Sequence, residues 1–279
     1  MTREGVMVLG QFLRARTGLS IASEKANLIE RRLKPVASAH GFKDVQSLVQ
    51  DLDTAGEDVC RAVIEAMTTN ETFFFRDRGP FDQFRDAMLP TLLKRRLSKR
   101  QIRIWCAGCS TGQEPYSLAM ILDGLPQFIG WIVEIVATDI NSEVISRAKN
   151  GLYYPFEVQR GLPGQMLVKH FHQSGTQWRI SQTMRNRVQF RVLNLLAPFA
   201  GPDTFDIVFC RNVLIYFDRQ TKQAVLDRLS LSLAHDGYLV LGAAETMLGL
   251  RKSFAPLDGA RGIYIKVAKG EPVRAAAAG

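Results

Sequence analysis

The sequence predicts an α/β protein in which a mostly parallel, Rossmann-like sheet follows an all-helical N-terminal domain. Residues 6–70 place apolar side chains at helical spacing. From residue 101 onward, short apolar runs of strand type alternate with helical patterns, which is typical of parallel βαβ units. The first of these runs, 102–105, leads into a turn with two glycines and then into an amphipathic helix, as at the nucleotide-binding edge of such sheets.

Breaks in the apolar pattern divide residues 6–70 into about four helices. The breaks fall at Thr17-Gly18, Pro35, Gly41 and Gly56. Glycine and proline end or interrupt helices, because glycine is too flexible and proline lacks the N–H that a helix needs. We therefore expect a small helical domain over residues 1–70.

Changes in composition set the other boundaries. Residues 71–100 hold an aromatic run and then a helical pattern that ends in Lys and Arg, which suits the negative end of a helix dipole. Residues 101–279 form the α/β domain. Within it, residues from about 151 to 187 are rich in glycine, aromatic and polar residues, and short strand-like pieces there predict a small inserted β subdomain.

The remaining strands of the main sheet follow from apolar runs bounded by polar or turn residues. A closing antiparallel pair at the end of the chain would complete a seven-stranded sheet. The runs lie at 132–139, 188–192, 205–210 and 238–241, and the closing pair lies at 254–257 and 263–267.

The turn Cys106-Ala-Gly-Cys-Ser-Thr-Gly112 is suited to hold a nucleotide-type ligand, because glycines let the backbone approach closely and the following helix start offers unpaired N–H groups. It lacks the GK[ST] ending of a phosphate-binding loop and is not a complete G-x-G-x-x-G. Gly108-x-Ser110-x-Gly112 matches the nucleophile elbow of α/β-hydrolases, but in that fold several strands precede the elbow. A methyltransferase turn that binds S-adenosylmethionine and a turn without any ligand are the remaining interpretations.

Asp139 ends the predicted strand 132–139, at the edge where this turn lies. In Rossmann-like folds an acid at this place accepts hydrogen bonds from both ribose hydroxyls, since two adjacent donors match the two oxygens of a carboxylate. The alternative is that Asp139 caps the helix predicted at 142–150.

Charge and cysteine usage limit the partners and the compartment. The net charge of +9 and the pI of about 9.6 favour an acidic partner: nucleic acid, anionic lipid or an acidic protein surface. No apolar run approaches the roughly 20 residues of a membrane span and no signal peptide precedes the domain, so we expect a cytoplasmic protein without membrane insertion. Cys106-x-x-Cys109 has no second cysteine pair, so no metal site is expected.

Four motifs, in order along the chain, resemble those of the CheR family, the chemotaxis receptor glutamate O-methyltransferases, and the resemblance spans nearly the whole chain. It implies a class I S-adenosylmethionine-dependent methyltransferase fold. It also implies transfer of a methyl group from S-adenosyl-L-methionine to glutamates on the cytoplasmic domain of methyl-accepting chemotaxis receptors, with S-adenosyl-L-homocysteine as the product. The motifs are Asn70-Glu-Thr-Phe-Phe-Phe-Arg-Asp77, the block 106–117, Ala137-Thr-Asp-Ile140 and Phe209-Cys-Arg-Asn-Val-Leu-Ile-Tyr-Phe-Asp218.

The resemblance also assigns site residues by position. It places three of them near the transferred methyl as catalytic residues: Arg76, Arg211 and Tyr216. A glutamate carboxylate is already anionic at pH 7 and needs no general base, so alignment is the main catalytic task. The implied cofactor contacts are Asn70, Thr72, Arg76, Glu114, Asp139, Asn194, Leu195, Arg211 and Asn212.

In the family, basic residues along the second helix contact the acidic receptor. Here Lys25, Arg31, Arg32 and Lys34 remain, whereas Pro35 and Ser38 interrupt the series, so we expect a retained but altered receptor contact.

Tethering through a receptor's C-terminal pentapeptide is not expected, because the hairpin loop at 174–177 is short. We further expect a monomer that acts in the cytoplasm and is recruited to receptor arrays.

Two other functions stay open as alternatives. A nucleic-acid methyltransferase usually carries an Asn/Asp-Pro-Pro-Tyr type motif after the fourth strand, where this chain has Cys210-Arg-Asn-Val, and no Pro-Cys pair exists for base-carbon methylation. A non-catalytic scaffold or sensor that only binds the cofactor is the second alternative, and an activity assay separates it from an enzyme.

Overall fold

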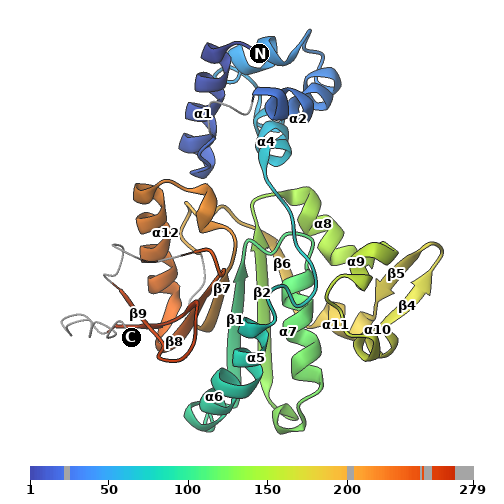
Figure 1. Cartoon of the computed structure of the whole chain (residues 1–279), viewed down its shortest axis with the longest axis vertical. Coiled ribbons are helices and arrows are strands. Elements are labelled where there is room, and N and C mark those ends of the chain that lie inside the picture. The colour runs from blue at the N-terminus through green and yellow to red at the C-terminus, as the bar shows by residue number, and fades with distance from the viewer. Residues whose placement is uncertain (22–25, 200–203, 246, 248–252, 268–279) are drawn as a thin grey trace.

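The computed structural model describes residues 1–21, 26–199, 204–245, 247 and 253–267. Its N-terminal domain has four helices around one core, in which Leu9, Leu13, Ile29, Leu33 and Leu48 are fully buried. Figure 1 shows this domain above the main sheet, with a single extended segment of the chain after α4 connecting the two. The helices are α1 (Arg3–Thr17), α2 (Ala26–Ala39), α3 (Val45–Gln50) and α4 (Glu57–Met67).

The break predicted at Pro35 is wrong, because α2 runs through this residue. Proline cannot donate a hydrogen bond to the carbonyl four residues earlier, which here belongs to Arg31. Arg31 and Pro35 are both exposed, so this carbonyl faces solvent and the helix loses little. The break at Gly18 is confirmed: this glycine ends α1 in the left-handed conformation, with φ of +77°.

Residues 68–78 carry the chain from α4 to a continuous helical segment. That segment comprises α5 (Gly79–Gln83), the π-helical turn η2 (Phe84–Met88) and α6 (Leu89–Arg95). The aromatic run anchors its start: the Phe74 ring packs edge-on against Tyr153 and Phe171, at centroid distances of 5.1 and 5.6 Å. The linker is therefore held against the α/β domain before its helix begins.

The main sheet has seven strands, as predicted, and their order is β6-β2-β1-β7-β8-β10-β9. The first five are parallel, and β10 runs antiparallel to β8 and β9. All carboxyl ends of the parallel strands face the N-terminal domain in Figure 1. The strands are β1 (Gln101–Ala107), β2 (Ile132–Asp139), β6 (Val188–Val192), β7 (Phe205–Cys210), β8 (Leu233–Leu241), β9 (Phe254–Pro256) and β10 (Ile263–Lys266).

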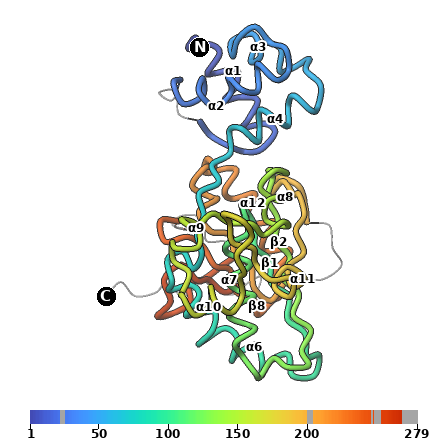
Figure 2. The backbone as a smooth tube through the Cα atoms, turned by 90° about the vertical axis from the view of Figure 1, so that its right-hand side faces the viewer, coloured from blue at the N-terminus to red at the C-terminus, as the bar shows by residue number. Residues whose placement is uncertain are grey.

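Helices cover both faces of this sheet, so neighbouring strand residues enter different cores. Ile104 packs with α7 (Gln113–Asp123), α8 (Ser142–Asn150) and the α5–α6 segment, whereas Trp105 packs with α12 (Arg219–Ser232). Two short helical turns complete the domain: η3 (Pro126–Phe128) and η4 (Leu214–Tyr216). Figure 2 shows the two domains stacked along the long axis of the molecule.

The predicted inserted subdomain is a three-stranded antiparallel sheet in the order β3-β5-β4, with three short helices beside it. Ser174 pairs with Gln177, so only two residues form the β4–β5 turn. Its elements are β3 (Leu152–Tyr153), α9 (Pro155–Gln159), α10 (Gly164–His170), β4 (Phe171–Ser174), β5 (Gln177–Ile180) and α11 (Gln182–Asn186).

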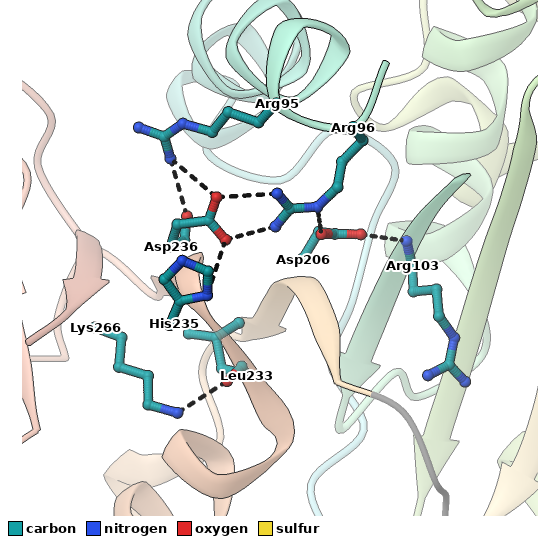
Figure 3. A network of polar contacts seen from close by, with 8 residues as sticks. All are labelled: Arg95, Arg96, Arg103, Asp206, Leu233, His235, Asp236 and Lys266. Carbon is teal, nitrogen blue, oxygen red and sulfur yellow. Dashed lines mark hydrogen bonds and ion pairs between the residues drawn. The ribbon is translucent and has the colours of Figure 1, made fainter. Parts of the chain in front are cut away.

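At the amino ends of the strands, a polar network ties α6 to the sheet (Figure 3). Arg96 donates from Nε to Asp206 at 2.7 Å and from its terminal nitrogens to both oxygens of Asp236. Asp206 also accepts the backbone N–H of Arg103 at 2.8 Å. The Arg96 guanidinium lowers the pKa of Asp236. This network joins β1, β7, β8 and α6 at the edge opposite the functional site.

Candidate functional site

A cavity with about 940 Å³ of free space, including its mouth, lies at the carboxyl ends of the parallel strands. Its walls come from both domains: Thr17 and Leu19 at the end of α1, the linker from Thr68 onward, and the turns after β1, β2, β6 and β7. The structure brings together at this cavity all ten residues predicted for cofactor binding or catalysis. These are Asn70, Thr72, Arg76, Glu114, Asp139, Asn194, Leu195, Arg211, Asn212 and Tyr216.

The turn after β1 needs both of its glycines. Gly108 has φ of +83° and Gly112 has φ of +93°, which favour glycine. A Cβ on Gly108 would also lie 2.4 Å from the Val213 side chain. The backbone therefore lies close to the turn after β7, and together they form one side of the cavity.

Ser110 in this turn is tied to the protein and not activated as a nucleophile. Its hydroxyl donates to the Asn70 carbonyl at 2.8 Å. No histidine is among the described residues that line the cavity. The nucleophile-elbow interpretation therefore lacks its base.

Asp139 lies at the cavity wall with 9% of its surface exposed. Its carboxylate accepts the backbone N–H groups of Ser110 at 2.8 Å and Asn141 at 3.1 Å. Burial raises its pKa, while these hydrogen bonds oppose the shift. Asn141 caps α8, so the helix-cap interpretation of Asp139 is wrong. Two carboxylate oxygens offer about four acceptor positions, which leaves capacity for hydroxyls of a ligand.

Arg211 joins the linker to α7 from within the wall. Its terminal nitrogens donate to Glu114 at 3.0 Å, to Asp77 at 2.9 Å and to the Arg76 carbonyl at 2.7 Å. Burial raises the pKa of Glu114, and the neighbouring Arg211 counteracts this rise. Arg211 is 6% exposed, and its Nε has no hydrogen-bond partner among the described residues. The site thus contains a buried, oriented cation.

Arg76 and Tyr216 both line the cavity, Arg76 from the linker and Tyr216 from η4. The Arg76 guanidinium lies 5.6 Å from the centre of the Phe73 ring and donates to the Glu71 carbonyl. The Tyr216 carbonyl accepts the Ser20 N–H at 2.9 Å, which links η4 to the segment after α1.

Asn194 connects the domains in addition to lining the cavity. Its Nδ2 donates to the Arg16 carbonyl at 2.7 Å, and its Oδ1 accepts the Leu196 N–H at 2.9 Å. Arg14 pairs with Asp218 at 2.6 Å beside this contact. The end of α1 is thereby docked on the α/β domain.

Two sets of residues at or behind the cavity wall were not predicted from the sequence. Glu245 follows β8, is 7% exposed, and accepts backbone N–H groups from Asn212 at 2.8 Å, Val213 at 2.9 Å and Gly242 at 2.7 Å. The sequence feature that could have indicated Glu245 as a site residue is that it is an acid a few positions after a buried strand. Thr17 and Leu19 belong to the helical domain, where no residue pattern pointed to the cavity.

The residues predicted to contact the receptor lie apart from the cavity wall. Arg31 and Lys34 are exposed on α2. Arg32 is half-buried and donates from Nη1 to the carbonyls of Met67 and Thr68, both at 3.0 Å. Arg32 therefore fixes the start of the linker. Lys25 lies outside the described residues.

The four cysteines are buried free thiols. Burial raises the pKa of Cys106 and of Cys109. The described part of the chain contains no group of three or more side chains arranged to hold a metal ion. Nor does it contain a helix long and apolar enough to span a bilayer.

Comparison with known proteins agrees with this geometry. Residues 8–68 match the family described as "CheR methyltransferase, all-alpha domain", and residues 70–263 match "CheR methyltransferase, SAM binding domain". The chemotaxis protein methyltransferase 1 of Pseudomonas aeruginosa is 39% identical, over 91% of this chain and 94% of its own. The chemotaxis protein methyltransferase Cher2 of Pseudomonas putida is 37% identical, over 90% and 94%.

Among solved structures, the plantazolicin methyltransferase BpumL in complex with SAH is similar over 78% of this chain and 60% of its own, with a TM-score of 0.34 and 14% identity. That likeness is too weak to argue from, whereas both sequence matches cover nearly the whole chain. With its helical domain, its seven-stranded sheet and the residues gathered at one cavity, the chain belongs to the CheR family of S-adenosylmethionine-dependent methyltransferases.

Proposed function

We propose that this enzyme transfers the methyl group of S-adenosyl-L-methionine to glutamate side chains on the cytoplasmic domain of chemotaxis receptors, forming glutamyl methyl esters. The observation that carries the proposal is the convergence, on one cavity, of a cofactor-type acid with two arginines and a tyrosine. These are Asp139, Arg76, Arg211 and Tyr216, the residues that the resemblance to the family assigns to the site.

The cavity residues fit the cofactor. Asp139 retains acceptor capacity for ribose hydroxyls. Arg211 and Asn212 line the cavity, and one buried polar atom of each, Arg211 Nε and Asn212 Oδ1, has no hydrogen-bond partner among the described residues. Together with Asn70, Thr72 and Glu114, these residues would hold the cofactor. When bound, S-adenosylmethionine supplies an electrophilic sulfonium methyl.

The protein's own task is to align the incoming carboxylate. A carboxylate ionised at pH 7 attacks without a general base, so the site needs orientation and removal of water. Arg76 offers a guanidinium at the cavity, with donors in a planar fork that matches a carboxylate. Tyr216 lines the cavity from η4 and offers a hydroxyl donor. The terminal nitrogens of Arg211 bind Glu114, Asp77 and the Arg76 carbonyl, so Arg211 also holds the linker that carries Arg76 in place.

The receptor would contact the exposed face of α2. Arg31 and Lys34 lie on this face, where positive charge complements an acidic receptor helix. Pro35 and Ser38 occupy the next positions of the same exposed face, so the contact is altered in its second half.

The two-residue β4–β5 turn supports methylation without a pentapeptide tether, since it leaves no long loop to dock a tail. We also propose that the enzyme acts as a cytoplasmic monomer at receptor arrays.

The decisive experiment incubates the enzyme with S-adenosylmethionine labelled in its methyl group and a panel of receptor cytoplasmic fragments. Base-labile label on receptor protein is expected, because methyl esters hydrolyse in alkali. Alkali-stable label, or label on added nucleic acid instead, would contradict the proposal. Binding of S-adenosylhomocysteine without any transfer would indicate the scaffold alternative.

Charge reversal tests the receptor contact. Arg31→Glu should raise the KM for receptor without changing S-adenosylhomocysteine affinity, because this side chain is exposed and away from the cavity. Arg32→Glu should impair both, because Arg32 also fixes the linker. Receptor methylation that is unchanged in both variants would refute this contact.

A further inference from the structure

Glu245 is a buried acid whose charge is met by backbone N–H groups. It lies after β8, and three N–H groups from two separate turns converge on its two oxygens. Among the described residues, no cation forms an ion pair with it. A carboxylate suits this place because both oxygens accept, whereas an amide would present an NH₂ group to at least one of these donors.

The turn that Glu245 holds is closely packed. Asn212 adopts φ of +59°, in the left-handed region that asparagine tolerates better than most other non-glycine residues. Gly242 packs directly against it, since a Cβ there would lie 2.9 Å from the Asn212 backbone nitrogen. Without the carboxylate, three buried N–H groups would lose their acceptor.

This same turn forms part of the cavity. Asn212 and Val213 line it, and the Val213 side chain leaves no room for a Cβ on Gly108 across the gap. The Val213 carbonyl accepts the Tyr216 N–H at 3.2 Å, so η4 is built on the turn. Glu245 thus influences the cavity indirectly, because it binds the backbone of residues 212–213, which line it.

We infer that Glu245 is a positioning residue for cofactor binding: its carboxylate fixes the turn 212–213 so that Asn212 meets the cofactor and η4 presents Tyr216. The inference rests on the cofactor part of the proposed function and not on the identity of the methyl acceptor. Gly242 and Glu245 act together: the absence of a side chain on Gly242 lets the Asn212 backbone approach closely, and the Glu245 carboxylate then binds the Asn212 N–H.

The test measures S-adenosylhomocysteine binding by titration calorimetry in Glu245→Gln, with no receptor present. A rise in Kd of about tenfold or more is expected, which corresponds to loss of about one buried hydrogen bond. Ala243→Ser changes an exposed residue of the same loop and should bind as the wild type does. Wild-type affinity in a folded Glu245→Gln protein would overturn the inference. If that variant does not fold, Glu245→Asp, which keeps two acceptors on a shorter chain, should fold and raise the Kd by several fold, and wild-type affinity in Glu245→Asp would overturn the inference.

A double-mutant cycle separates positioning from general support of the fold. Asn212→Ala alone should also raise the Kd. If Glu245 acts through the turn, the Glu245→Gln substitution should raise the Kd much less when it is made in the Asn212→Ala variant than when it is made in the wild-type protein. The inference would be overturned if the double variant raised the Kd by the product of the two single-variant factors, because the two residues would then act independently. Wild-type enzyme that binds S-adenosylhomocysteine but labels no receptor would refute the proposed acceptor and leave this inference standing.

Discussion

Tyr216 lines the cavity from the end of η4, and its hydroxyl is the part of the side chain suited to orient a carboxylate. We predict that Tyr216→Phe lowers kcat by about tenfold, the effect of one lost hydrogen bond of about 1.4 kcal/mol in the transition state. The Kd for S-adenosylhomocysteine should stay within about twofold, since the ring remains. Steady-state kinetics at saturating receptor and calorimetry check this pair of values. Unchanged turnover would remove Tyr216 from the mechanism.

Asp139 should make cofactor binding sensitive to acid. Burial raises its pKa, so it takes up a proton at a higher pH than an exposed aspartate does. Only the ionised form accepts hydrogen bonds from both ribose hydroxyls at full strength. The Kd for S-adenosylhomocysteine should therefore rise as the pH falls from about 7 toward this raised pKa.

Asp139→Asn supplies the comparison for that pH dependence. The variant should bind more weakly at neutral pH and should lose the Asp139 part of the acid-side weakening. Glu114 also has a raised pKa, but it remains paired with Arg211 in both proteins. Calorimetry across the pH range gives both curves. Parallel curves for the two proteins would show that Asp139 is not the titrating group.

At the scale of the elements, the Arg96 network holds α6 against three strands of the sheet. Arg96, Asp206 and Asp236 are only 16%, 9% and 19% exposed at their side chains. Removing Arg96 leaves Asp206 without a cation and leaves Asp236 with only its longer pair to the more exposed Arg95. We predict that Arg96→Met lowers the free energy of unfolding by about 3 kcal/mol. Denaturant unfolding measures this loss.

The matched control is Arg95→Met, whose pair with Asp236 is more exposed and should contribute less than about 1 kcal/mol. Arg96 lowers the pKa of Asp236 below its unfolded value. The stabilisation that the Arg96–Asp236 ion pair provides is thus present above about pH 4. It disappears as the pH falls through the lowered pKa of Asp236 in the folded protein. The difference between wild type and Arg96→Met should accordingly narrow in acid. A constant difference would show that the network is not charge-dependent.

The elements themselves were largely predictable from the sequence. Apolar runs located the seven strands, most clearly β7, which is buried at every residue, because a strand covered on both faces is largely apolar. The prediction for β8 was too short, since this strand begins at Leu233 and its first residues include polar and exposed ones. Glycine marked the ends of helices, as Gly18 shows. Pro35 does not end its helix, because the cost of a proline depends on whether the freed carbonyl can meet solvent, and this depends on the packed structure.

The site was predictable where it follows strand ends and not where it depends on how distant loops meet. Asp139 and Asn212 each follow a recognisable strand, and the family motifs contain both. Glu245 acquires its role only when the turns after β7 and β8 come together. The docking of Thr17 and Leu19 arises from contact between domains, which no local pattern encodes.

At the scale of the whole molecule, the docked end of α1 should control cofactor affinity. Gly18 has φ of +77°, and a Cβ there would lie 2.6 Å from Thr221 of the α/β domain. We predict that Gly18→Ala weakens S-adenosylhomocysteine binding by several fold, because it displaces Thr17 and Leu19 from the cavity wall. Calorimetry measures the Kd.

Gly41 offers a closely matched control. It also has φ of +77°, but no atom lies within 4 Å of the Cβ position. Gly41→Ala should therefore carry a similar backbone strain of about 1 kcal/mol without disturbing the domain contact. Equal weakening in both variants would mean that loss of helical-domain stability, and not the docking of α1, sets the affinity.

The cavity is built partly from each of two separately cored domains, so ligand occupancy and domain association are thermodynamically linked. A nucleoside that touches both sides adds to the free energy holding them together. The helical domain should consequently melt at a higher temperature when the site is filled, although most of the ligand contacts lie in the other domain. Exchange of spent product for fresh cofactor would then be limited by the rate at which the Asn194–Arg16 and Ser20–Tyr216 bonds open.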